Sequence, residues 1–124
     1  MKLLVVDQST VVRSFCSKTI EELGHRAYTA SNSHLAIKLL DENIIDGCII
    51  NAHLPGNSGL ELIYEMRSYK DLADLPITLM AEDKIARDFA IQLDKLKVVT
   101  IIQRSELSES TLARVVAVMQ NRAA

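Results

Sequence analysis

The chain has 124 residues, of which 48% are hydrophobic and 24% are charged, and its formal net charge at pH 7 is −2. This length is typical of one domain with a single hydrophobic core. The small negative charge provides no basic field for nucleic acid, and no apolar run approaches the roughly 20 residues that span a bilayer. The sequence therefore predicts one cytoplasmic domain, residues 1–124, that binds neither nucleic acid nor membrane.

Short apolar runs alternate with amphipathic stretches along the chain. The apolar runs predict strands at residues 3–6, 27–30, 47–51, 77–80 and 98–102. Helical spacing predicts helices near residues 12–23, 35–40, 60–66 and 83–93, and a last helix that Ser108 caps. Gly24 is expected to end the first helix, and Ile85 and Phe89 are the expected anchors of the fourth.

Strands that are apolar throughout, each followed by a helix, are typical of a parallel sheet with helices on both faces. The sequence therefore predicts an α/β fold with a five-stranded, doubly wound parallel sheet. In such sheets ligands lie beyond the carboxyl ends of the strands, where the strand order reverses. The candidate site residues close strands one, three, four and five: Asp7, Gln8, Asn51, Ala81, and Gln103 or Arg104.

Asn51 occupies the place where such a domain carries its chemistry. A carboxylate there could attack a phosphoryl group, but a neutral amide has no comparable nucleophilicity. A dinucleotide-binding enzyme is disfavoured, because residues 7–12 contain no G-x-G-x-x-G. Cys16 and Cys48 are too far apart for a zinc motif and are expected to be buried thiols. We therefore expect a domain that is not an enzyme.

Several segments of the chain match the pattern of a known family. Residues 3–9 are an apolar run followed by an acid, an amide and a small residue, and residues 54–62 read Leu-Pro-Gly-Asn-Ser-Gly-Leu-Glu-Leu. Leu75-Pro76 and residues 104–108 fit the same pattern. Over nearly its whole length the chain thus resembles the receiver domains of bacterial two-component response regulators. The resemblance implies a flavodoxin-like sheet with the strand order 2-1-3-4-5.

The resemblance also implies a phosphorylation switch, in which a histidine kinase phosphorylates a central Asp and acidic residues hold Mg²⁺. The phosphoacceptor position is Asn51 in this chain, and Gln8 replaces the second acid, so that Asp7 is the only acidic ligand position left. Ala81 falls at the position of a hydroxyl residue. The Lys position falls on Arg104 or Gln103, and the aromatic residue before it is missing.

These replacements affect both the metal and phosphoryl transfer. Because Mg²⁺ prefers charged oxygen ligands, we expect its binding to be weak or absent and no other cofactor to bind. Asn51 is expected to form a hydrogen bond with Asp7 or with loop amides. Asp7 either caps the first helix, orients the following loop or keeps a role as a ligand; Arg104 either pairs with Asp7 or is a solvated loop residue.

We therefore expect a pseudo-receiver, a phosphorylation-independent signalling module that acts through protein–protein interaction. The resemblance implies a partner, such as a kinase, another signalling protein or an output domain, on the face of the fourth helix, fifth strand and last helix, with a homodimer as a further mode. The alternative is a regulator that senses phosphoryl groups or small anions through weak Mg²⁺-dependent binding. An output domain after Ala124 would make this chain the N-terminal module of a longer regulator.

Overall fold

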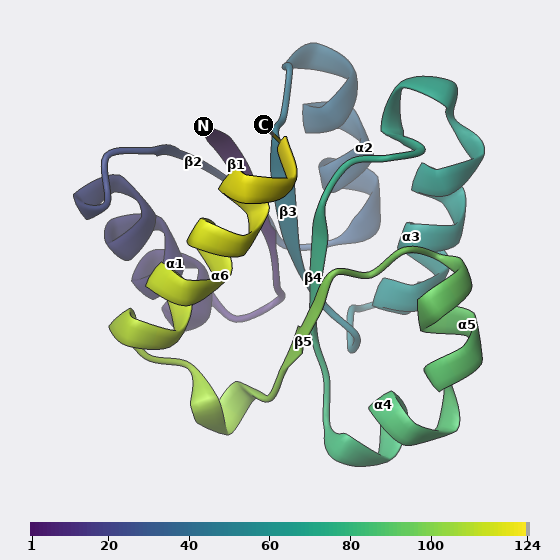
Figure 1. The fold of residues 1–124 in the computed structure, drawn as a ribbon. Coiled ribbons are helices and arrows are strands. Elements are labelled where there is room, and N and C mark those ends of the chain that lie inside the picture. Colours follow the sequence, from purple (N-terminus) through teal and green to yellow (C-terminus); the bar gives the residue numbers. More distant parts are fainter. Residues whose placement is uncertain (124) are drawn as a thin grey trace.

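The computed structural model describes residues 1–123 and contains one parallel sheet of five strands (Figure 1). The strands are β1 (Lys2–Val6), β2 (Arg26–Ala30), β3 (Gly47–Asn51), β4 (Ile77–Met80) and β5 (Thr100–Ile102). Their order is β2-β1-β3-β4-β5, so that the winding direction reverses between β1 and β3. The predicted fold class and strand order are both confirmed.

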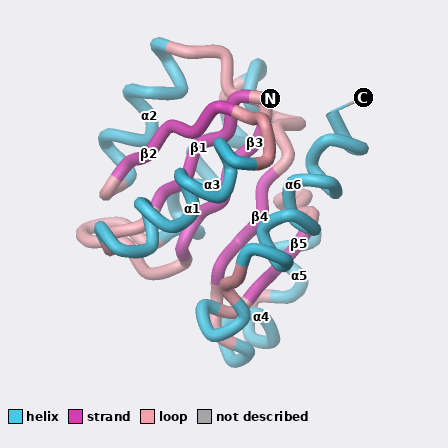
Figure 2. The backbone as a smooth tube through the Cα atoms, turned by 90° about the vertical axis from the view of Figure 1, so that its left-hand side faces the viewer, coloured by secondary structure: helices cyan, strands magenta, loops and turns pink. Residues whose placement is uncertain are grey.

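Helices cover both faces of the sheet, as Figures 1 and 2 show. Helices α1 (Thr10–Glu22) and α6 (Glu109–Ala123) lie on one face. The other face carries α2 (Ser33–Glu42), α3 (Gly59–Ser68), α4 (Asp83–Asp88) and α5 (Ala90–Lys95). Two 3-10 helices, η1 (Lys70–Leu72) and η2 (Arg104–Glu106), connect these elements. No helix within residues 1–123 combines the length and the apolar character needed to cross a membrane.

The core has two layers because neighbouring side chains of a strand point to opposite faces of the sheet. From β1, Leu3 and Val5 pack against α1 and α6, whereas Leu4 and Val6 pack on the side of α2 and α3. All five residues of β3 are buried. Burial on both faces explains why the central strands are continuous apolar runs rather than alternating ones.

The first three helices begin at side chains that accept a hydrogen bond from the backbone N–H three residues ahead. These N-caps are Ser9 (3.3 Å), Asn32 (2.9 Å) and Ser58 (3.2 Å). The predicted cap at Ser108 is confirmed, because its Oγ accepts from the backbone N–H of Thr111 at 3.1 Å. The predicted end of α1 is also confirmed, since Gly24 adopts a φ of +90°.

The fourth helical region differs from the prediction. Instead of one helix over residues 83–93, α4 ends at Asp88, and Phe89 separates it from α5 with a φ of −113° and a ψ of 19°. Phe89 is 39% exposed and is therefore no anchor; Leu93 and Leu96 are the buried residues of this region. The predicted fifth strand is also too long, since pairing with β4 begins only at Thr100.

Candidate functional site

Asp7 and Asn51 meet at the carboxyl edge of the sheet. Asp7 directly follows β1 and is 1% exposed, while Asn51 closes β3 and is 7% exposed. Because the winding direction reverses between these two strands, the loops that follow them diverge and leave a crevice. Inside it, the Asn51 side-chain Nδ2 donates a hydrogen bond of 2.8 Å to Asp7 Oδ2.

The remaining polar atoms of this pair are bonded to the loops. Asp7 Oδ1 accepts from the backbone N–H of Ser9 at 2.8 Å, and Asn51 Oδ1 accepts from the backbone N–H of His53 at 2.9 Å. The amide of Asn51 thus donates with its nitrogen and accepts with its oxygen, which defines its orientation. The predicted hydrogen bonds to Asp7 and to a loop amide are confirmed. Asp7 orients the loop after β1, whereas the helix cap is Ser9 and not Asp7.

Arg13 adds a cation next to this pair, which the sequence did not suggest. Its guanidinium donates to the backbone carbonyl of Asp7 at 2.7 Å and to Thr10 Oγ1 at 3.3 Å. The one available signal was a basic residue in the first turns of the helix that follows an acid. The guanidinium thereby fixes the backbone at the end of β1 to the first turn of α1.

Two glycines shape the loop after Asn51. Gly56 adopts a φ of +82°, a conformation that favours glycine in a tight turn. At Gly59 a Cβ atom would collide with the backbone carbonyl of Asn51 and lie 2.9 Å from Cα of Ala52. The N–H of Gly59 instead donates to the carbonyl of Ala52 at 2.8 Å, so that α3 begins directly against the end of β3.

A cavity of about 100 Å³ opens above the Asp7–Asn51 pair. Its lining residues are Gln8, Asn51, His53, Met80, Ala81, Glu82 and Arg104. The structure thus brings Gln8, Asn51, Ala81 and Arg104 together around one space. Gln103 does not line it, because its side-chain Nε2 donates to Asp83 Oδ1 at the start of α4, at 2.8 Å.

Arg104 is exposed and forms no ion pair with any side chain in residues 1–123. The pairing with Asp7 that the sequence left open is therefore absent from this part of the chain, and Arg104 lies on the rim as a solvated residue. Glu82 also lines the cavity, although the sequence did not suggest it. Asp7 was the only acid expected at this site, but Glu82 follows Ala81 directly and lies on the cavity wall.

The residues of the pocket fit Mg²⁺ poorly. Both carboxylate oxygens of Asp7 already accept hydrogen bonds, and so does the side-chain oxygen of Asn51. Gln8 offers only a neutral amide, and the described residues contain no cluster of three or more His, Cys, Asp or Glu side chains arranged for a metal. Since Mg²⁺ gives up its water reluctantly and prefers charged oxygen ligands in octahedral array, these residues do not form a suitable magnesium site.

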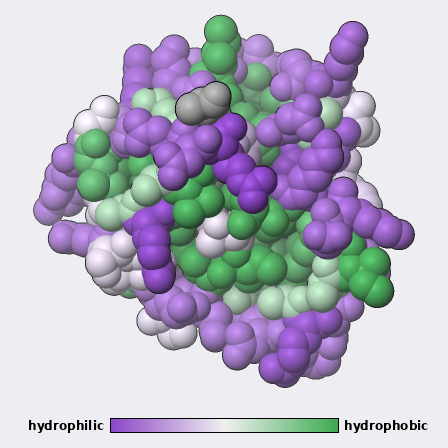
Figure 3. Space-filling model, viewed as in Figure 1, coloured by the Kyte–Doolittle hydropathy of each residue, from purple (hydrophilic) through white to green (hydrophobic). Residues whose placement is uncertain are grey.

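A second hollow lies between β5 and α6, on the face where the family resemblance implies a partner. It measures about 340 Å³ and is lined by Thr100, Ile101, Ile102, Glu106, Arg114, Val115 and Val118. Figure 3 shows apolar side chains gathered in the middle of this face and hydrophilic side chains around them. Ile101 is 40% exposed although it belongs to a strand. An apolar centre with a polar rim is typical of a protein-binding surface.

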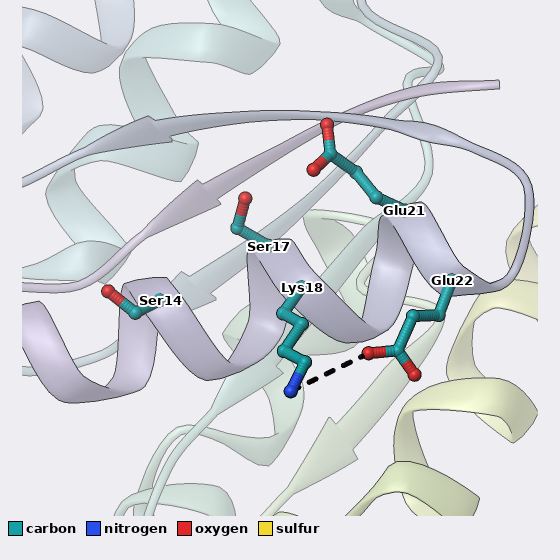
Figure 4. A pocket seen from close by; sticks show the side chains of 5 residues that line it. All are labelled: Ser14, Ser17, Lys18, Glu21 and Glu22. Carbon is teal, nitrogen blue, oxygen red and sulfur yellow. Dashed lines mark ion pairs between the residues drawn. The ribbon is translucent and has the colours of Figure 1, made fainter.

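A third hollow, on the outer surface of α1, has no comparable construction. Figure 4 shows its lining side chains, Ser14, Ser17, Lys18, Glu21 and Glu22, which all come from α1. The one ion pair among them joins Lys18 and Glu22 at 4.0 Å and is exposed. Because no second element encloses these side chains, they form a solvated helix surface rather than a binding site.

The comparison with known proteins agrees with this geometry. The family model of the response regulator receiver domain matches residues 3–116. A chemotaxis protein CheY homolog of Campylobacter jejuni is 34% identical over 85 residues, which are 67% of this chain and 65% of that protein. The matched segment thus spans slightly less than two thirds of this curated relative.

Solved structures show the same fold. The chemotaxis response regulator CheY4 of Vibrio cholerae has a TM-score of 0.85 at 19% identity, with 95% of this chain and 97% of that chain covered. NtrX from Brucella abortus has a TM-score of 0.84 at 18% identity, with 98% of this chain but only 27% of that chain covered. Because the family model spans most of its length, this chain belongs to the receiver-domain family of two-component response regulators.

Proposed function

We propose that this receiver domain is a pseudo-receiver, which acts by binding a protein partner and is not controlled by phosphorylation of the position that Asn51 occupies. The hydrogen bond of 2.8 Å from Asn51 to Asp7 carries the proposal. It places a neutral amide, which donates to Asp7 and accepts from the N–H of His53, where the family has a nucleophilic carboxylate. The amide also donates to the buried carboxylate of Asp7, so that this carboxylate has a hydrogen-bond donor without a metal ion.

Two further features of the pocket support this proposal. Ala81 provides no hydroxyl to contact a phosphoryl group, and Gln103, next to the rim residue Arg104, points to Asp83. Phosphoryl transfer depends almost entirely on positioning and charge neutralisation, which these residues do not supply. We assign partner binding to the groove between β5 and α6, together with the neighbouring surface of α4 and α5, as the family resemblance implies.

Incubation with Mg²⁺ and either a small acyl-phosphate donor or beryllofluoride tests the first part of the proposal. We expect no added mass in the intact protein and no saturable change in the amide chemical shifts of residues 50–54. A stable phosphoryl adduct, or a shift that saturates with Mg²⁺, contradicts the proposal. The double variant Asn51→Asp, Gln8→Asp restores two carboxylates and serves as the positive control.

Binding of a partner tests the second part. Once a partner has been captured from the source cell, wild type is expected to bind it with the same affinity in the presence and absence of phosphodonor. Ile101→Asp in the groove should weaken this binding at least tenfold, because it buries a charge at an apolar contact. The matched control Val11→Asp changes an exposed apolar residue of α1 and should leave the affinity unchanged.

One observation favours a second function, the sensing of small anions. Arg104 lines the cavity of about 100 Å³ without an ion pair in residues 1–123, and Gln8 and His53 offer further donors. Glu82 on the same wall opposes an anion electrostatically. A titration with inorganic phosphate, followed by the chemical shifts of Ala81 and Arg104, distinguishes the two functions. Saturation that Arg104→Gln abolishes would assign the pocket to anion sensing.

A further inference from the structure

Strand β2 is one of the two edge strands of the sheet, as Figure 2 shows. Its neighbour β1 pairs with it along one side. The N–H of Arg26 donates to the carbonyl of Met1 at 2.9 Å, and the carbonyl of Ala30 accepts from the N–H of Asp7 at 3.1 Å. The first and the last residue of β2 therefore turn their backbone groups toward β1.

The residues between them alternate. In a parallel ladder, every second residue of a strand turns its N–H and carbonyl to the same neighbour, so that Tyr28 also faces β1 while Ala27 and Thr29 face outward. The backbone groups of Ala27 and Thr29 form no hydrogen bond with a loop, a helix or a side chain in residues 1–123. Two donors and two acceptors thus line the open edge.

This edge lacks the features that usually keep edge strands apart. Such features are proline, lysine, a β-bulge or a very short strand. All five residues of β2 pair one to one with residues 2–6, which leaves no bulge, and none of them is proline or lysine. Arg26 and Thr29 are exposed, so that another strand can reach the edge.

The opposite edge, β5, offers less. This strand has three residues, and the 3-10 helix η2 begins two residues after its end. The carbonyl of Ile102 accepts from the N–H of Ala81 at 2.9 Å and so turns toward β4. By the same alternation, Ile101 is the one residue of β5 whose backbone groups both turn outward.

We infer that β2 pairs with β2 of a second copy of this chain, antiparallel about a two-fold axis at Tyr28. The outward groups of Ala27 and Thr29 lie symmetrically on either side of that axis. Ala27 of each copy therefore exchanges two hydrogen bonds with Thr29 of the other, which gives four bonds in all. A pattern that is complementary to itself fits an isologous contact, and this makes a second copy the occupant.

The side chains of β2 are compatible with this pairing. The two Tyr28 residues stand directly opposite each other and form an aromatic cross-strand pair. Arg26 stands opposite the small Ala30 of the second copy, and its guanidinium lies over the Tyr28 ring of its own chain, 5.2 Å from the centroid. The two Arg26 residues are about 14 Å apart along the strands, beyond the screening length of about 8 Å at physiological salt.

Sedimentation equilibrium of wild type tests the occupant. We expect a dissociation constant of about 0.1 mM, because two five-residue strands bury less surface than the interfaces of tight complexes. The mean mass should then rise from near 13.8 kDa at about 5 µM toward twice that value at about 1 mM. A mass that stays at 13.8 kDa over this range overturns the homodimer.

Amide hydrogen exchange by NMR tests the register. Between about 0.05 and 1 mM protein, exchange at Ala27 and Thr29 should slow about threefold, because only the dimer protects these N–H groups. The N–H groups of Arg26 and Tyr28 are already bonded to β1 and should not change. Equal exchange of Ala27 and Thr29 at the two concentrations contradicts the inference.

Proline substitution tests the edge itself. Thr29→Pro removes an outward N–H without breaking the ladder to β1, so that the chain should stay folded while the dissociation constant rises at least about tenfold. Thr29→Ala keeps the N–H, is the matched control and should dimerise as wild type does. A dimer that Thr29→Pro leaves intact overturns the assignment to β2.

Disulfide trapping provides evidence that does not depend on the proline variant. Opposed Tyr28 residues have Cα atoms about 4.5 Å apart, within the range of a disulfide, so that Tyr28→Cys should cross-link on oxidation. Thr29→Cys stands opposite Ala27 and should cross-link much less, although Thr29 is more exposed. Cys16 and Cys48 are buried and do not compete. Equal yields from the two variants would contradict the two-fold axis at Tyr28.

The homodimer does not rest on the pseudo-receiver proposal. Strand β2 lies at the opposite edge of the sheet from β5, so that the groove between β5 and α6 stays open in each copy. None of these measurements uses a phosphodonor or another protein. Their failure is therefore distinguishable from a failure of the proposed function.

Discussion

Helices α1 to α3 and the segment of residues 83–97, which contains α4 and α5, are stabilised by different means, although both cover the same sheet. Each of the first three helices has a side-chain N-cap and buries at least three residues. In the segment of residues 83–97, α4 buries none and has no such cap. Hydrophobic burial stabilises the first region broadly, whereas the second buries only Leu93 and Leu96 and is otherwise attached by hydrogen bonds from Arg67 and Gln103.

The difference indicates where this domain can move. Regions with few buried apolar contacts and exposed backbone hydrogen bonds open at lower free energy than the core. The polar pair of Asp7 and Asn51 is buried, while Glu82 on the cavity wall and Asp83 after it are exposed. We therefore expect the side of the pocket at Glu82 to open at lower free energy than the side at Asp7 and Asn51.

Asn51→Asp should have the largest effect on stability, because it disrupts the buried polar pair of Asp7 and Asn51. It exchanges a donor for a second carboxylate within hydrogen-bond distance of Asp7. Repulsion of this kind shifts a carboxyl pKa by about 1 to 3 units, or about 1.4 to 4 kcal/mol of stability at pH 7. Urea unfolding without divalent cations measures it. Asn57→Asp in the exposed loop is the control, and equal losses in both variants would contradict the expectation.

The buried thiol of Cys48 in β3 should make the free energy of unfolding depend on pH in the alkaline range. Burial raises the pKa of this thiol from 9.0 to about 12. Above pH 9 the unfolded chain loses the proton that the folded chain keeps, so that stability falls as pH rises from 9 to 12, by about 1.4 kcal/mol per pH unit. Between pH 8 and 10.5, the free energy of unfolding should therefore decrease less with rising pH in Cys48→Ala than in wild type. An equal decrease in the two proteins would disprove this linkage.

Thr78→Val in β4 should stabilise the protein. Thr78 is fully buried in β4, and its hydroxyl has no hydrogen-bond partner among the described residues. Replacing it by a methyl group of similar shape removes a desolvation cost of about 1 kcal/mol, so that the free energy of unfolding should rise by that amount. Thr100→Val on the paired position of β5 is the control and should give no comparable gain, because Thr100 is only partly buried.

Capping provides the smallest and most direct test of the comparison. Ser58→Ala removes an N-cap bond of α3 and should lower stability by about 1 kcal/mol. Glu82→Ala, at the N-cap of α4, removes no such bond and should change stability by less than about 0.5 kcal/mol. Thermal unfolding of both variants checks this difference. A loss at Glu82 as large as that at Ser58 would show that α4 depends on its cap as the other helices do.

The fold was largely predictable because its signals are local. Continuous apolar strands such as residues 47–51 and helical spacing in α1 need no distant contact to be recognised. The segment of residues 83–97 was not predictable in the same way. The apolar spacing from Ile85 to Leu93 favours one helix, whereas the structure has two helices that are separated at Phe89.

By itself, the sequence determined the α/β class, the receiver pattern and the loss of the carboxylate at Asn51, because residue identity and short-range periodicity carry this information. The tertiary structure alone decided that Arg104 rather than Gln103 lines the cavity and that Glu82 joins it. It also placed Arg13 and Arg67 on carbonyl groups. Contacts of this kind depend on how side chains from separate strands and helices converge, and the spacing along one chain contains no record of that convergence.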